Sequence, residues 1–272
     1  MTVSIITAAY NSATTIEDTI KSVLWQTYAD IEYIVKDGGS TDGTLEICRR
    51  YEPMFNGRMR IISEKDDGMY DAMNIGIEAA TGDVVGILNS DDFFTTDDAV
   101  KCIVDTFEKK DTDAIYGDVH YVEADDLNRC VRYYSSKPFQ RWTMRLGFMP
   151  AHPTFYVKKG VYEKYGMFDT SYKIAADFDN VLRLIYINRI KTAYVDRDLV
   201  TMRAGGASNA NYKNRMQIMR DHLASLKKHG IYSNAFIMSF RYIYKIYEVA
   251  ITPIAYKKAL KKIALTKTRS FF

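Results

Sequence analysis

Residues 82–94 read GDVVGILNSDDFF, an apolar run that ends abruptly in carboxylates. The run from Val84 to Leu88 is bounded by turn residues, which is typical of a central strand in a parallel sheet. In open α/β sheets, ligands bind beyond the carboxyl ends of the strands. Asp91 and Asp92 follow at that point, and such carboxylates suit a hard divalent cation that can hold a diphosphate. The alternative is a helix N-cap, because aspartate is favoured there.

The composition is that of a folded protein with a substantial core. The 272 residues are 47% apolar and 13% aromatic, which excludes disorder and allows one large α/β domain, alone or with a small appendage. Three widely spaced cysteines match neither a disulfide framework nor a zinc site, so a reducing compartment is expected. The N-terminus enters a strand pattern at once, and we expect no secretory signal.

The net charge of +3 hides a marked asymmetry. Residues 211–272 carry 13 Lys and Arg against 2 Asp and Glu, a charge of +11, whereas residues 1–210 carry −8. A basic C-terminal segment therefore follows a globular body, which indicates an anionic surface as a partner.

Strand and helix patterns alternate along most of the chain. Strands are expected over residues 3–8, 31–36, 59–63, 84–88 and 114–116, with helices over 14–26, 44–51, 69–80 and 97–109 between them. This alternation predicts a doubly wound, Rossmann-like and mostly parallel central sheet flanked by helices. Right-handed crossovers then place the strand ends near Ala8, Asp37, Ser63 and Leu88 along one rim, where we expect the site.

The second strand ends in DGGSTDGT, residues 37–44. Its glycines allow the backbone to approach a ligand closely, and Asp37 can accept hydrogen bonds from a base or ribose. A plain turn, with Thr41 or Asp42 capping the next helix, is the alternative. The stretch is neither a GxGxxG fingerprint nor a phosphate loop, which disfavours hydride transfer and kinase activity.

A second polar stretch, EKDDGMYDAMNIG at residues 64–76, combines an acidic loop with small residues on a helix. Ala72 and Gly76 lie four residues apart on one face, so the helix can pack closely against the sheet or a ligand. Packing alone also accounts for this pattern.

Six short motifs occur in a characteristic order and spacing: TAAYN (7–11), DGGSTDGT (37–44), EKDDGMYDAMNIGI (64–77), LNSDD (88–92), GMFD (166–169) and AADFDNVLRL (175–184). Together they resemble the family 2 inverting nucleotide-sugar glycosyltransferases, whose fold is called GT-A. The resemblance covers about residues 1–210. It implies a nucleotide-sugar half over about 1–118, an acceptor half over about 119–210, and a basic helical extension over 211–272.

The resemblance also implies roles for residues in the first half. The donor would contact a set of loop residues at the strand ends: Thr7, Ala8, Ala9, Tyr10, Asp37, Asp66, Ser90, Asp91 and Asp92. Asp91 matches the last carboxylate of the family's D-x-D element, which binds Mn²⁺ or Mg²⁺ at the donor diphosphate. This chain has Asn89 where many relatives have the first aspartate, so the coordination departs from the common pattern.

In the second half, Asp177 matches the family's general base. Relatives often have Glu-Asp there, whereas this chain has Ala176-Asp177, which leaves Asp177 as the single candidate. Helix N-capping is the alternative for this residue. We expect His152 either on the acceptor side of the cleft or as a structural loop histidine. Arg203 is also expected on the acceptor side or, together with residues 205–208, over the diphosphate.

The basic segment contains apolar and aromatic residues interleaved with Lys and Arg from Asn234 onward. The charges interrupt it too often for a confident membrane-spanning helix. We expect Pro253 to break the helix and a second short helix to carry Lys257, Lys258, Lys261 and Lys262. The pattern favours a helix lying in the interface of an anionic membrane. The alternative is a helix packed on the body with a solvated basic face. No motif supports binding of nucleic acid.

The sequence thus predicts a metal-dependent inverting glycosyltransferase with a Mn²⁺ or Mg²⁺ cofactor, a UDP-sugar favoured as donor and a lipid-linked glycan as acceptor. We expect it in the cytoplasm, on the cytoplasmic face of the membrane. A catalytically silent nucleotide-sugar-binding module recruited to a membrane is the competing hypothesis, favoured by Asn89 and Ala176. A nucleotidyltransferase is less compatible, because its basic glycine-rich phosphate loop is missing.

Overall fold

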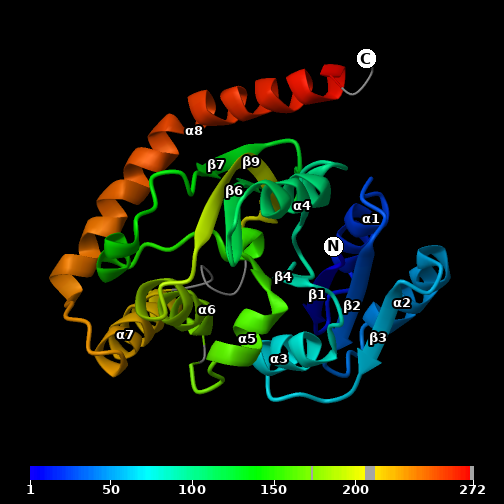
Figure 1. The fold of residues 1–272 in the computed structure, drawn as a ribbon, viewed down its shortest axis with the longest axis horizontal. Coiled ribbons are helices and arrows are strands. Elements are labelled where there is room, and N and C mark those ends of the chain that lie inside the picture. Colours follow the sequence, from blue (N-terminus) through cyan, green and yellow to red (C-terminus); the bar gives the residue numbers. More distant parts are fainter. Residues whose placement is uncertain (173, 206–211, 270–272) are drawn as a thin grey trace.

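The first four strands run parallel in the order β3-β2-β1-β4 (Figure 1). The computed structural model describes residues 1–172, 174–205 and 212–269. The four strands are Val3–Ala9 (β1), Ile31–Asp37 (β2), Met59–Ser63 (β3) and Val84–Ile87 (β4). Their apolar runs reflect burial on both faces, since Ile5 and Ile6 belong to different cores on the two sides of the sheet. The predicted parallel sheet is confirmed for this half of the fold.

The second half of the sheet is mixed. Its strands are Phe93–Phe94 (β5), Ala114–Val122 (β6), Cys130–Tyr134 (β7), Tyr156–Lys158 (β8) and Thr192–Arg203 (β9). Strand β8 runs antiparallel to both β4 and β6, whereas the long β9 runs parallel to β6. Strands β5 and β7 add antiparallel pairings to β9 and β6.

Helices cover both faces of this sheet (Figure 1). One core contains side chains of α1 (Ile16–Leu24), α2 (Thr44–Tyr51) and α4 (Ala99–Lys109). The other contains side chains of α3 (Met69–Ala79), α5 (Lys159–Tyr165), α6 (Ala176–Val181), α7 (Tyr212–Lys228) and α8 (Ala235–Arg269). Short 3₁₀ turns at Glu52–Phe55 (η1), Arg141–Leu146 (η2) and His152–Thr154 (η3), and a π turn at Leu182–Ile187 (η4), complete the elements.

A glycine in the middle of β4 lets a neighbouring strand approach closely. A Cβ atom on Gly86 would lie 2.1 Å from Cε1 of Tyr156, a fully buried residue of β8. The glycine in the middle of the apolar run is therefore required by packing between β4 and β8.

Strand β6 is longer than the expected residues 114–116. Its later residues Asp118 and His120 are polar, which obscures the strand pattern, but both are buried with partners from distant strands. The Oδ2 atom of Asp118 accepts a 2.8 Å hydrogen bond from the hydroxyl of Tyr133, and the Nδ1 atom of His120 lies 2.8 Å from Oδ2 of Asp198.

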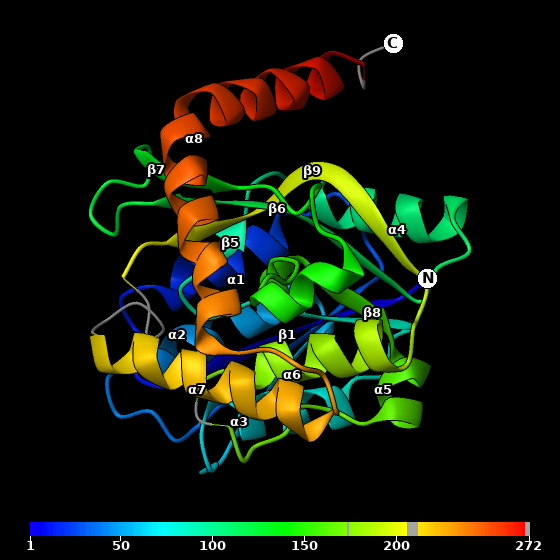
Figure 2. The same ribbon diagram turned by 90° about the vertical axis from the view of Figure 1, so that its left-hand side faces the viewer.

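The predicted break at Pro253 is wrong. Helix α8 continues from Ala235 to Arg269 with Pro253 inside it, and it changes direction along its length (Figures 1 and 2). A proline removes one backbone hydrogen bond and its ring crowds the preceding turn, so a long helix can bend at a proline without ending. Within the described ranges, none of the helices is both long and apolar enough to pass through a lipid bilayer.

Candidate active site

A cleft of about 850 Å³ opens at the carboxyl ends of β1, β2 and β4, at the predicted rim. Elements of the second half form its opposite wall. Most predicted site residues line this cleft: Ala8, Ala9, Tyr10, Asp66, Ser90, Asp91, Asp92, His152, Asp177 and Arg203. The structure therefore gathers residues that are more than 190 positions apart in the sequence.

Two predicted donor-binding residues, Thr7 and Asp37, lie beneath the cleft surface and are fully buried. The Thr7 hydroxyl donates to the carbonyl oxygen of Leu88 at 2.8 Å, which ties β1 to the end of β4. The Asp37 carboxylate accepts hydrogen bonds from the Ser63 hydroxyl at 2.7 Å and from the backbone amides of Gly39 and Ser40. Both side chains hold the loops at the rim of the cleft in place.

Lys36 was not predicted as a site residue. Its ammonium group is fully buried, lies 2.8 Å from Oδ2 of Asp66, and also donates to the carbonyl oxygens of Asp37 and Glu64. A Cβ atom on Gly38 would lie 2.8 Å from the same Asp66 oxygen, so the glycine leaves room for this ion pair. The available signal was a lysine directly after the buried run Tyr33–Val35 of strand β2 and directly before Asp37.

The turn after β4 presents two aspartates in different environments. The carboxylate of Asp92 is buried and accepts a 2.8 Å hydrogen bond from the Asn89 side-chain amide. Burial, followed by the neighbouring charge of Asp91, raises the pKa of Asp92 well above its usual range. Neither aspartate caps a helix, because α4 begins after Asp98, so the capping alternative is wrong.

Arg203 of β9 braces this turn from the other side. Its guanidinium donates to the backbone carbonyl of Asp91 at 2.6 Å, forms an ion pair with Asp18 of α1 and packs over the ring of Phe93. Arg203 thus contacts the turn that follows β4. Of the predicted loop that follows it, residues 206–208 lie outside the described residues.

The chemistry of the turn fits a divalent cation. The Asp91 carboxylate faces the cleft, and no hydrogen bond or ion pair engages it among the described residues. Hard cations take such oxygen ligands together with those of a substrate phosphate. Among the described residues, no three or more His, Cys, Asp or Glu side chains are grouped so that they could hold a metal ion. A cation at this turn would therefore also need oxygen ligands from a bound substrate.

Asp177 and His152 form the centre of the opposite wall. The Nδ1 atom of His152 lies 3.5 Å from Oδ2 of Asp177, and its Nε2 atom lies 3.3 Å from the Asn89 amide nitrogen. Desolvation in the cleft raises the pKa of Asp177 and lowers that of His152. The N-cap of α6 is Ala175, so the capping alternative for Asp177 is wrong.

Asn89 links the two sides of the cleft, a role that its sequence position does not predict. Its amide contacts Asp92 on the donor side and His152 on the other wall. Tyr121, Phe155 and Asn180 also line the cleft and were not predicted. No quoted motif contains Tyr121 or Phe155, and Asn180 lies three residues after Asp177 in the AADFDNVLRL motif.

Residues 4–172 match the family model described as Glycosyl transferase family 2. The chain belongs to that family. A PGL/p-HBAD biosynthesis glycosyltransferase of Mycobacterium bovis is 28% identical over 208 residues, which is 76% of this chain and 78% of the relative. An uncharacterized glycosyltransferase of Mycobacterium tuberculosis is 34% identical over 187 residues, 67% of this chain and 68% of the relative. The family match ends before Asp177.

Solved structures show the same GT-A fold for this glycosyltransferase. Residues 1–349 of TarS from S. aureus in complex with UDP-GlcNAc superpose with a TM-score of 0.66 at 18% identity, over 83% of this chain and 66% of that one. A mannosyltransferase from Pyrobaculum calidifontis in complex with GDP-Man and Mn²⁺ gives a TM-score of 0.64 at 17% identity, over 99% of this chain and 80% of that one.

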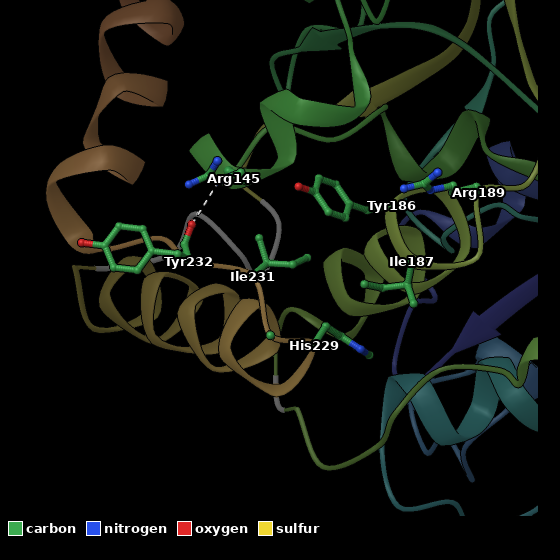
Figure 3. Close-up of a pocket in the computed structure, with 8 residues that line it drawn as sticks. Arg145, Tyr186, Ile187, Arg189, His229, Ile231 and Tyr232 are labelled. Carbon is green, nitrogen blue, oxygen red and sulfur yellow. Dashed lines mark hydrogen bonds between the residues drawn. The ribbon is translucent and has the colours of Figure 1, made fainter.

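A second, more open hollow of about 490 Å³ lies apart from this cleft, at the turn between α7 and α8 (Figure 3). Arg145 and Arg189 line it together with His229 and Tyr232. None of the predicted site residues lies in this hollow, so it is not part of the candidate active site.

Proposed function

We propose that this glycosyltransferase moves a hexosyl or N-acetylhexosaminyl group from a nucleotide sugar to a glycan hydroxyl with inversion. The observation that carries the proposal is a single cleft that Asp91 and Asp177 line from two distant segments of the chain. Asp91 lies beside the loops of β1 and β2, and Asp177 lies opposite, next to His152. This arrangement allows a donor diphosphate and an attacking hydroxyl to be handled from two sides.

Asp177 is the proposed general base. As the acceptor oxygen bonds to the anomeric carbon, its proton passes to the Asp177 carboxylate, and the bond from that carbon to the diphosphate oxygen breaks with the electron pair leaving on the diphosphate. One displacement of this kind inverts the anomeric centre. The raised pKa of Asp177 makes its carboxylate a stronger proton acceptor than an exposed aspartate. His152 lies within reach to hold that carboxylate in place.

Donor binding is proposed for the first half of the cleft, with a UDP-sugar favoured. The buried Lys36–Asp66 pair and the amides held by Asp37 keep the loops that face the base and ribose in fixed positions. The structural neighbours with UDP-GlcNAc and GDP-Man support a nucleotide-sugar donor. When bound, a Mn²⁺ or Mg²⁺ ion would be held by Asp91 and would stabilise negative charge on the leaving diphosphate as a Lewis acid.

The proposed acceptor is a lipid-linked glycan used in surface polysaccharide synthesis, at the cytoplasmic face of an anionic membrane. The +11 charge of residues 211–272 supports this location, because anionic lipid surfaces attract basic segments. A silent nucleotide-sugar-binding module is the second candidate, since Asn89 replaces an acidic ligand and Ala176 replaces an acidic neighbour of the base.

A panel of UDP-, GDP- and dTDP-sugars, each with Mn²⁺ and with chelator, tests the proposal. We expect metal-dependent binding of one donor with slow release of free nucleotide, and faster release once a suitable acceptor is added. Donor binding without any turnover, with or without acceptor, would favour the silent module. Binding of no donor at all would contradict both.

A further inference from the structure

Helix α8 attaches to the body through polar side chains. Glu248 is 2% exposed, and its Oε2 accepts hydrogen bonds from Nη2 and Nε of Arg132 in β7 at 2.6 and 3.2 Å. One turn later, the Thr252 hydroxyl accepts a 2.9 Å hydrogen bond from the backbone amide of Tyr133. Lys262 pairs with Asp196 further along the helix. Met238 is a buried apolar exception near the start of the helix.

The opposite face of the helix is apolar and exposed, which reverses the usual polarity of a surface helix. Six exposed apolar side chains lie on this face: Phe236, Phe240, Ile243, Ile246, Tyr247 and Ile254. We call them the outer stripe. Ile243, Ile246 and Ile254 are 65%, 72% and 75% exposed. From Phe236 to Ile254 the stripe extends for about 30 Å at the helical rise.

The charges around the outer stripe are positive. Lys257, Lys258 and Lys261 are the exposed charged side chains among the described side chains of α8. Glu248, the one acidic residue in the sequence of α8, points inward to Arg132. At the other end, Arg145 of the open hollow lies beside the first turn of the helix, and none of the residues lining that hollow is acidic (Figure 3).

We propose that the outer stripe lies in the interface of an anionic membrane, with its apolar side chains below the headgroups and the flanking lysines among the lipid phosphates. The proposal rests on the proposed function, because it names the surface by which the enzyme reaches a lipid-linked acceptor. A row of apolar side chains followed along the helix by exposed lysines complements anionic headgroups. The same charges would repel those of a second copy brought against the stripe.

The position of α8 suits this role. Arg132, held by Glu248, stacks between the rings of Tyr121 and Tyr134 at 5.1 and 5.3 Å. Tyr121 lines the cleft together with His152 and Asp177. A membrane bound along α8 would therefore lie beside the acceptor half of the cleft. The packed cluster around Arg132 connects that half of the cleft to the helix.

Flotation with vesicles tests the proposal on the full chain. The wild type should float with vesicles of phosphatidylcholine and phosphatidylglycerol in equal parts, and far less with phosphatidylcholine alone. The triple variant Ile243→Gln, Ile246→Gln and Ile254→Gln removes exposed apolar surface and keeps good helix formers, so binding should fall roughly tenfold or more while thermal unfolding is unchanged. The matched control is Trp25→Gln with Met54→Gln, which replaces exposed apolar residues after α1 and in η1 and should bind like the wild type.

A charge variant tests the electrostatic part. Changing Lys257, Lys258 and Lys261 to Gln should weaken binding to the anionic vesicles by roughly fivefold for each lysine, and high salt should have a similar effect. The double variant Arg145→Gln with Arg189→Gln is the comparison. If it lost vesicle binding while the triple lysine variant kept it, the assignment of the membrane-binding charge to α8 would be overturned. Failure of the wild type to bind vesicles, or a solution dimer that the triple variant separates, would overturn the membrane assignment.

Donor hydrolysis without vesicles is measured on the same proteins. It should be equal in the wild type and the triple variant, because the outer stripe does not line the cleft. Vesicle binding by a protein that hydrolyses no donor would contradict the proposed transfer reaction alone. Donor hydrolysis without vesicle binding would contradict this inference and the proposed membrane location, and would leave the proposed transfer reaction standing.

Discussion

The Nδ1 atom of His152 lies 3.5 Å from Oδ2 of Asp177, on the wall opposite the donor loops. Asn89, in turn, links the other imidazole nitrogen to Asp92 on the donor side. The side-chain amide of Asn89 thus bridges both walls of the cleft. Asn89 therefore has a structural role that an aspartate at this position would not reproduce.

Asp177→Asn should abolish sugar transfer and spare donor binding. The amide keeps the shape of the side chain but cannot take the proton of the acceptor hydroxyl, and loss of a general base lowers kcat by roughly 10²–10⁴-fold. Steady-state transfer and donor titration measure the two effects separately. Asp105→Asn, on the outer side of α4, is the matched control and should change neither. Retained turnover in Asp177→Asn would refute the assignment of the base.

The pH dependence of kcat/KM should show an acid limb above the usual range of an aspartate. Desolvation raises the pKa of Asp177, and the base works only when deprotonated, so activity should rise as pH passes upward through that pKa. Protonated His152 lowers the pKa of Asp177, so His152→Gln should move the limb to higher pH. A limb at the ordinary aspartate pKa would mean that Asp177 is well solvated in the free enzyme and would contradict the assigned shift.

Asp91→Ala should weaken donor binding in the presence of Mn²⁺ and have little further effect with chelator. Removing the carboxylate takes away the cation ligand that faces the cleft, without breaking any hydrogen bond of the side chain among the described residues. Calorimetric titration of donor with metal and with chelator measures the difference. Asp125→Ala, an exposed residue between β6 and β7, should behave like the wild type. Equal binding by Asp91→Ala and the wild type under both conditions would remove its metal role.

The sequence predicted the elements whose pattern is local. The run from Val84 to Leu88 is continuous because β4 is buried on both faces, and Asp91 follows it to the cleft. The later part of β6 was not predicted, since Asp118 and His120 look exposed until Tyr133 and Asp198 are placed beside them. The outer stripe was not predicted either, because the composition of α8 does not reveal which side of the helix meets the body.

Attachment of α8 through its polar face gives the last prediction. The Arg132 and Glu248 side chains are 18% and 3% exposed, and Glu248 Oε1 has no hydrogen-bond partner among the described residues. Arg132→Met leaves a buried carboxylate without its counter-charge, and breaking such a pair costs about 3–5 kcal/mol. We expect a lower free energy of unfolding in urea and faster amide exchange along α8.

The double variant Arg132→Met with Glu248→Leu removes both charges, so it should be more stable than the single variant. Lys101→Met, which breaks an exposed pair with Asp105 on α4, is the matched control and should cost less than about 1 kcal/mol. A single variant no less stable than this control, with unchanged exchange in α8, would show that the helix is held by its few apolar contacts around Met238 instead. In that case the burial of Glu248 would be a consequence of the docking of α8 onto the body, and not its cause. The exposed outer stripe would still need a binding partner.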